Sequence, residues 1–182
     1  KLNLGSNTMT WTALDVNGNS STCTTTVLVK KRPTILIYNG DLVEQYSDSV
    51  DLSATLTDNV SSTGVEGKTI KFTIGSQTTT AVTNANGVAS TTLILTQSPG
   101  NYAVVTEFLE DASYLGSSDS DAFDITQENA EVVYTGQTLQ ATPTTRDTEA
   151  VIVLRANIQD ITANAGYSLY DPYAGDIRNA RV

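Results

Sequence analysis

The chain has 182 residues, a hydrophobic content of 39%, no histidine, one cysteine and a formal net charge of −10. These numbers exclude most zinc, haem and Cys/His catalytic sites, and with only 10 lysines and arginines nucleic-acid binding is not expected. No apolar stretch approaches the ~20 residues that cross a bilayer, and no signal peptide is recognised, so residue 1 is not expected to be the natural start.

The first predicted element is a β-hairpin. Residues 8–13 and 24–29 alternate polar and apolar side chains, and Asn17-Gly18 supplies the tight turn between them. Trp11 is expected to fill the core of its own module. Cys23 has two interpretations that the residues leave open, a small buried hydrophobe or one half of a disulfide.

A short charged joint, KKRP at 30–33, follows the hairpin, and further short strands come after it. The expected strands lie at 34–38, 50–58, 70–74, 78–83, 88–95, 102–106 and 123–125. The polar stretch TNANGVAS at 83–90 is interpreted as a hairpin turn with Asn86-Gly87 at its corner. Short strands separated by turns every 8 to 12 residues predict an immunoglobulin-like sandwich.

An internal repeat sets the organisation of the chain. The motif at 35–40 returns at 131–136, and the alternating pattern at 50–58 returns at 152–160. The first thirty residues supply only the last two or three strands of a module, which bury too little to stand alone. We therefore expect an all-β array of tandem immunoglobulin-like β-sandwich modules. Its predicted parts are the end of one module (1–30), a complete module (31–127) and the start of another (128–182).

Residues 4–29 resemble the C-terminal half of a hyalin-type (HYR) repeat, an immunoglobulin-like module of extracellular proteins. The resemblance rests on the G-x-N-T-x-T-W-T-A run, the D-x-x-G-N turn and the cysteine before the last strand. In that family the late cysteine commonly pairs with one near the start of the module. Carried to Cys23, this implies a disulfide partner upstream of residue 1.

Residues 34–126 resemble bacterial immunoglobulin-like (Big) repeats of cell-surface proteins. The resemblance rests on GKTIKFTIG, on TNANGVAS, on P-G-x-Y-x-V at 99–104 and on EDASYLGSSDSDAFDI. Asn84 stands where an aspartate is usual, and Leu109-Glu110 replace the common small residues before Asp111. Residues 130–182 look like the start of a related module. Such modules serve as spacers, adhesins and enzyme appendages alike, so the resemblance implies a fold and a compartment more than a function.

Two groups of side chains are calcium candidates. Asp15, Asn17 and Asn19 match the start of an EF-hand loop, but residue 26 is threonine where that loop needs glutamate, so a plain hairpin turn is favoured. Asp119 and Asp121 lie near the second joint, where carboxylates can share a cation or simply form a solvated edge strand.

A third candidate is a tyrosine-rich loop. Tyr167, Tyr170 and Tyr173 interrupt the strand pattern and offer a contact for carbohydrate or protein, or pack over the joint between strands.

The residues do not indicate catalysis. The 20 acidic residues carry no pocket signal for a glycosidase pair, and no serine has a histidine as its base. The expected function is a stalk or filament segment of a large extracellular bacterial surface protein, without a cofactor unless calcium binds. The expected partners are neighbouring modules, other copies in a filament, and a surface glycan or protein, but neither nucleic acid nor membrane. The alternatives are a ligand-binding adhesion module and a non-catalytic appendage of a secreted enzyme.

Overall fold

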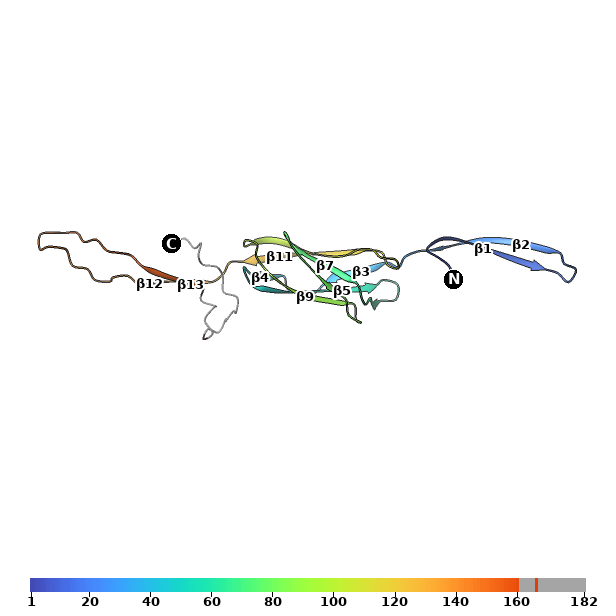
Figure 1. The fold of residues 1–182 in the computed structure, drawn as a ribbon, viewed down its shortest axis with the longest axis horizontal. Coiled ribbons are helices and arrows are strands. Elements are labelled where there is room, and N and C mark those ends of the chain that lie inside the picture. The colour runs from blue at the N-terminus through green and yellow to red at the C-terminus, as the bar shows by residue number, and fades with distance from the viewer. Residues whose placement is uncertain (161–165, 167–182) are drawn as a thin grey trace.

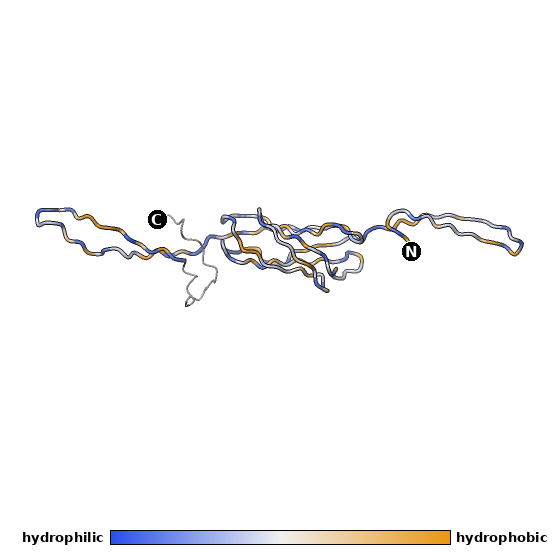
Figure 2. The backbone as a smooth tube through the Cα atoms, in the orientation of Figure 1, coloured by the Kyte–Doolittle hydropathy of each residue, from blue (hydrophilic) through white to orange (hydrophobic). Residues whose placement is uncertain are grey.

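The computed structural model describes residues 1–160 and residue 166. Within these residues every regular element is a β-strand, which confirms the all-β fold class. Figure 1 shows three parts that follow one another along the long axis. An N-terminal ribbon is formed by β1 (Gly5–Leu14) and β2 (Ser20–Val29), a central sandwich by β3 to β11, and a C-terminal ribbon by β12 (Ala130–Tyr134) and β13 (Ala156–Asp160). Figure 2 shows a hydrophilic joint between the N-terminal ribbon and the central sandwich.

The central sandwich consists of two sheets. The strands of the larger sheet, in spatial order, are β4 (Val43–Gln45), β11 (Ser117–Thr126), β10 (Gly100–Phe108), β7 (Thr69–Ile74) and β8 (Gln77–Val82). The smaller sheet contains β3 (Thr34–Tyr38), β5 (Ser49–Asp58), β9 (Val88–Ile94) and the two-residue β6 (Thr63–Gly64). β3 pairs antiparallel with β5, whereas β4, the next strand along the chain, pairs parallel with β11 in the other sheet. This arrangement is immunoglobulin-like, as the strand spacing predicts.

The core lies between the two sheets and follows the two-residue period of the strands. In β5, Val50, Leu52, Ala54 and Leu56 are buried while the residues between them are more exposed. The buried apolar side chains are Leu36, Tyr38, Val50, Leu52, Ala54, Leu56, Val65, Ile70, Phe72, Ile74, Ala89, Leu95, Val104, Phe108, Phe123 and Ile125. Each large one contributes about 1.5–3 kcal/mol, so this cluster is the main source of the stability of the sandwich.

The turn at 83–90 is not a hairpin. Gly87 has a φ of +79°, as expected, and the turn is closed by Asn84 N–H donating to Val88 O at 2.9 Å. However, β8 pairs with β7 in one sheet, whereas β9 pairs with β5 in the other. The turn therefore carries the chain from one sheet to the other. The sequence signal for both connections is the same, because it reports only the local backbone bend.

The C-terminal ribbon repeats the pairing of β3 with β5. The matched cross-strand pairs are Tyr38–Ala54 with Tyr134–Ala156, Leu36–Leu56 with Val132–Ile158, and Thr34–Asp58 with Ala130–Asp160. The two tyrosines also make the same local bond, since each hydroxyl donates to the carbonyl oxygen three residues further on, at 2.6 Å from Tyr38 and 2.8 Å from Tyr134. The strand pairing thus follows the sequence repeat residue by residue.

The N-terminal ribbon has the register of the last hairpin of the sandwich. Gly5 pairs with Val29 as Gly100 pairs with Ile125, and the antiparallel ladders continue in step from there. The predicted hairpin is confirmed. The expectation that Trp11 fills a core is wrong for this structure, because Trp11 is 62% exposed. Among the described residues β1 pairs only with β2, so no second sheet covers this face.

Candidate functional site

The carboxylate of Asp15 organises the tip of the N-terminal ribbon. Its Oδ1 accepts the N–H groups of Asn17 at 2.9 Å and Asn19 at 2.8 Å, and its Oδ2 accepts Nδ2 of Asn19 at 2.7 Å. These bonds, first of all that from the Asn19 side chain, lower the pKa of Asp15. Gly18 adopts a φ of +86° beside them. The three calcium candidates thus form a self-contained turn, and calcium binding by them stays a prediction.

The second group of calcium candidates, Asp119 and Asp121, lies at a seam between the sheets. Asp119 and Asp121 are both on the core-facing side of β11 and are half-buried, unlike a fully solvated edge. Oδ2 of Asp119 accepts the backbone N–H of Tyr38 at 2.8 Å, and its Oδ1 accepts the N–H of Ser120 at 3.0 Å. Burial, then the charges of Asp41 and Asp121, raise the pKa of the Tyr38 hydroxyl.

Asp119 therefore serves as the missing hydrogen-bond partner for an edge strand. No group of three or more histidine, cysteine, aspartate or glutamate side chains is placed to hold a metal in the described part of the chain. Calcium at the second joint remains a prediction.

The remaining sequence candidates are a thiol and a loop. Cys23 is exposed, with a free thiol, and pairs across the ribbon with Trp11. The buried-hydrophobe interpretation is therefore wrong here, while a disulfide to a cysteine upstream of residue 1 stays a prediction. Tyr167, Tyr170 and Tyr173 lie outside the described residues.

The sequence interpretation missed the most elaborate polar site, which is centred on Arg32 at the first joint. Nε of Arg32 forms an ion pair with Oδ2 of Asp58, whose side chain is only 4% exposed. Oδ1 of the same carboxylate accepts the N–H groups of Val60 at 2.8 Å and Ser61 at 3.2 Å. The Arg32 bond, ahead of these backbone bonds, holds the pKa of Asp58 at about 2.

The backbone of Arg32 is held as firmly as its side chain. Its N–H donates to Ser113 O and its carbonyl oxygen accepts from Leu115 N–H, both at 2.9 Å. The joint residue therefore belongs mechanically to the central sandwich. The sequence does carry a signal for this carboxylate, because Asp58 recurs in the repeat as Asp160. The structure buries both aspartates.

A second ion pair lies near the same end of the sandwich. Nζ of Lys68 is 2.5 Å from Oδ2 of Asp111 and 5.1 Å from the centroid of the Tyr114 ring. Lys68 is the first cause of the depressed pKa of Asp111, about 2, and the backbone N–H groups of Ser113 and Tyr114 assist. Because the acid stays ionised beside a charged amine, the pair is suited to hold a loop rather than to perform chemistry.

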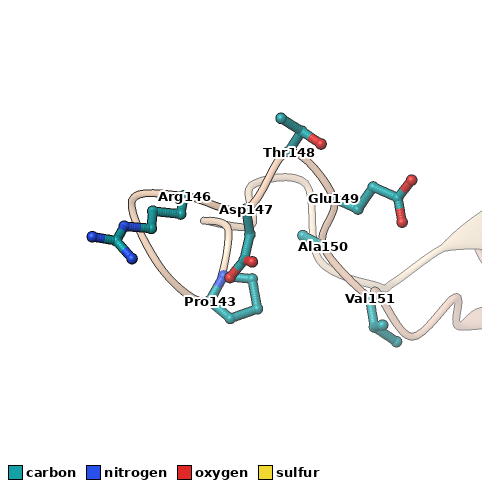
Figure 3. A pocket seen from close by; sticks show the side chains of 7 residues that line it. All are labelled: Pro143, Arg146, Asp147, Thr148, Glu149, Ala150 and Val151. Atoms are coloured by element: carbon teal, nitrogen blue, oxygen red, sulfur yellow. The ribbon is translucent and has the colours of Figure 1, made fainter.

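One surface hollow is formed by a single loop of the C-terminal ribbon. Its lining residues are Pro143, Arg146, Asp147, Thr148, Glu149, Ala150 and Val151. Figure 3 shows the side chains of Arg146 and Glu149 extending in opposite directions, so these charges do not converge on the hollow. Asp147 is engaged by the hydroxyl of Thr144 at 2.7 Å. Binding sites usually combine an apolar wall with convergent polar groups, and the charged groups of this hollow do not converge.

Comparison with known proteins gives likenesses to solved structures and none to a sequence family. No family model matches the chain, and no curated protein matches it. The chain is similar to a solved structure described as a tetra-tandem repeat in the extending region of a large adhesion protein, with 18% sequence identity and a TM-score of 0.41. The similarity covers 88% of this chain and 47% of that structure, so the chain spans less than half of its length. No helix in the described residues has the length and apolar character needed to cross a membrane.

Proposed function

We propose that this chain is a structural stalk segment of a large extracellular surface protein of bacteria, and that it holds other parts of that protein away from the cell. The observation that carries the proposal is the direction of the chain through the central sandwich. Because β4 and β11 are parallel, the chain enters the sandwich at one end and leaves it at the other. Modules built in this way extend an array along a line.

Two further features support a spacer. Arg32 of the first joint is held to the sandwich by an ion pair and by backbone hydrogen bonds, which shortens the part of the joint that can bend. The net charge of −10 favours mutual repulsion of neighbouring chains and solubility outside the cell. On this proposal the chain is not an enzyme, it needs no cofactor, and its partners are first of all the neighbouring modules.

The proposal is tested by changing the number of modules. Variants would carry one, two or three copies of residues 31–127 between unchanged flanks, and small-angle X-ray scattering would give the maximum dimension of each. A stalk adds a constant length per copy, whereas a flexible string of modules grows roughly with the square root of the copy number. Growth of the second kind would contradict the stalk. A glycan array probed with the unmodified chain tests the main alternative, since specific binding would favour a recognition module.

A further inference from the structure

The first and last segments of the central sandwich run side by side over their whole length. Residues 32–47 contain β3 and β4, and residues 113–128 contain β11. The side-chain hydrogen bonds between them join residues that are 81 to 83 positions apart. The paired strands β4 and β11 keep the same offset, since Asp124 stands opposite Val43. The two segments therefore form one continuous parallel pair.

Backbone hydrogen bonds close this pair at both ends. At the N-terminal end, Arg32 forms a parallel bridge with Tyr114 and exchanges the two bonds described above. At the other end, Asp124 N–H donates to Leu42 O and Tyr46 N–H donates to Thr126 O, both at 3.0 Å. Beyond it the Ser47 hydroxyl donates to Oε1 of Glu128 at 3.0 Å.

Side chains fill the gap where the two segments belong to different sheets. The Thr34 hydroxyl is 2.9 Å from Leu115 O and 2.8 Å from the Ser117 hydroxyl. Further along, the Asp119 carboxylate accepts Tyr38 N–H. Hydrogen bonds thus join the two segments from the first joint to the second, always between residues about 81 positions apart.

The parallel direction decides how these ties respond to tension. A pull on residue 31 and on residue 129 draws the two segments past each other along their length, so all the ties resist together. A pull on residues 31 and 112, which lie at the same end of the pair, opens the ties one after another from Arg32. Forced unfolding depends on the barrier to the first disruptive step, and that barrier is higher when several bonds must break at once.

We propose that residues 32–47 and 113–128 form a load-bearing clamp that keeps the central sandwich folded while the chain is under tension. The proposal rests on the stalk function for the source of the tension, but the clamp itself is a property of this sandwich. The outer strands β7 and β8 lie off the load path, since the chain reaches them only after the first segment and leaves them before the last.

The test pulls the full chain in two directions with optical tweezers. Cys23 provides an exposed thiol for one handle. The second handle is attached through Asn129→Cys for the shearing direction or through Ala112→Cys for the peeling direction, and both positions are exposed. We expect the unfolding force to be several-fold higher through Asn129→Cys than through Ala112→Cys. Equal forces in the two directions would overturn the clamp.

A matched pair of substitutions locates the resistance. Thr34→Val removes the hydroxyl that ties the two segments and keeps the shape of the side chain. Thr55→Val makes the same change on the neighbouring strand β5, where the hydroxyl donates to Asn39 Oδ1 and so does not join residues 32–47 to residues 113–128. In the shearing direction we expect Thr34→Val to lower the unfolding force and Thr55→Val to leave it unchanged. Equal effects of the two substitutions would contradict the assignment.

The two experiments can contradict the clamp and the stalk function independently. A strong dependence of the force on direction, combined with square-root growth of array length, would keep the clamp and remove the stalk. Linear growth combined with equal forces would do the reverse.

Discussion

The C-terminal ribbon and the β3–β5 pair have the same register but opposite environments. Leu36 in β3 is 4% exposed, whereas Val132, at the matching place in β12, is 56% exposed. The alternating pattern and the local tyrosine bond are thus sufficient to define which residues pair. Burial requires the facing sheet, which in the central sandwich is supplied mainly by β7, β10 and β11. Pairing is a local property of this sequence, and core formation is not.

The largest expected effect separates two glycines with the same backbone conformation. A Cβ on Gly87 would lie 2.3 Å from Leu56 O, whereas a Cβ on Gly18 would meet nothing within 4 Å. Gly87→Val should therefore combine the left-handed penalty with overpacking and lower the free energy of unfolding of the sandwich by about 3–5 kcal/mol. Gly18→Val should leave the unfolding of the sandwich unchanged, because it strains only the N-terminal ribbon.

Urea unfolding followed by circular dichroism measures the stability of both glycine variants. Tryptophan fluorescence would not report on the sandwich, because the only tryptophan, Trp11, lies in the N-terminal ribbon. A Gly87→Val chain as stable as the unmodified one would refute the close approach of the backbone at this turn.

The next effect compares Leu56 with its repeat equivalent, Ile158. Leu56 is fully buried, so Leu56→Ala should cost about 3 kcal/mol through lost transfer free energy and a cavity. Ile158 is only partly buried, and we expect Ile158→Ala to leave the urea midpoint of the central sandwich in place. A shift of that midpoint by Ile158→Ala would mean that ribbon and sandwich unfold as one cooperative unit.

Acid should destabilise the central sandwich through its paired carboxylates. The folded pKa values of Asp58 and Asp111 are about 2, below the ordinary value of 3.8, so the unfolded chain binds protons first. Their stabilising contribution is complete above pH 4 and is lost as the pH falls towards 2.

The repeat places Glu128 at the position of Arg32, so the C-terminal ribbon has no arginine at the matching place.

Arg32→Gln isolates the Asp58 contribution. Removal of the guanidinium should raise the pKa of Asp58 towards 3.8 and weaken the sandwich at neutral pH, where that contribution is normally complete. A carboxyl-carbon NMR titration reports this pKa directly, with Asp111 as the internal control. An unchanged pKa of Asp58 in Arg32→Gln would contradict the ion pair.

The smallest effect concerns the outer face of the larger sheet. Nζ of Lys71 is 3.8 Å from Oε2 of Glu107, and both side chains are about half exposed. Solvent screens such a pair, so Lys71→Gln should change the free energy of unfolding by less than about 0.5 kcal/mol in a urea titration. A decrease in the free energy of unfolding as large as that of Leu56→Ala would show that this exposed ion pair stabilises the sandwich as much as a core side chain does.

Much of the fold was predictable because it depends on neighbours in the sequence. Alternation located β3 and β5, and Asn86-Gly87 marked a backbone corner correctly. Two short strands, β4 and β6, were missed, since three and two residues carry too little pattern of their own and are defined by their partner strands. The prediction of a hairpin at 83–90 is wrong for the same reason, because the sheet that each flanking strand joins depends on distant strands.

The polar sites were less predictable than the strands. The charged joint was recognised, but nothing near Arg32 in the sequence indicates that its partner is Asp58, 26 residues further on. The sequence predicts a cation ligand or a solvated residue at Asp119, yet its carboxylate accepts the backbone N–H of Tyr38, 81 residues away. A carboxylate in an alternating strand carries no mark of which backbone group it will accept from.

Two side chains occupy backbone groups on the edge strands β3 and β9 of the smaller sheet, with a consequence for how repeated modules fold beside one another. Asp119 occupies the N–H of Tyr38 on β3, and the carboxamide of Gln77 occupies both Ile94 O at 2.8 Å and Thr96 N–H at 2.9 Å next to β9. Each of these groups would otherwise be available to a strand of similar sequence from the next module. Neighbouring repeats that fold beside one another are thereby discouraged from exchanging strands, so each module is guided to fold on itself.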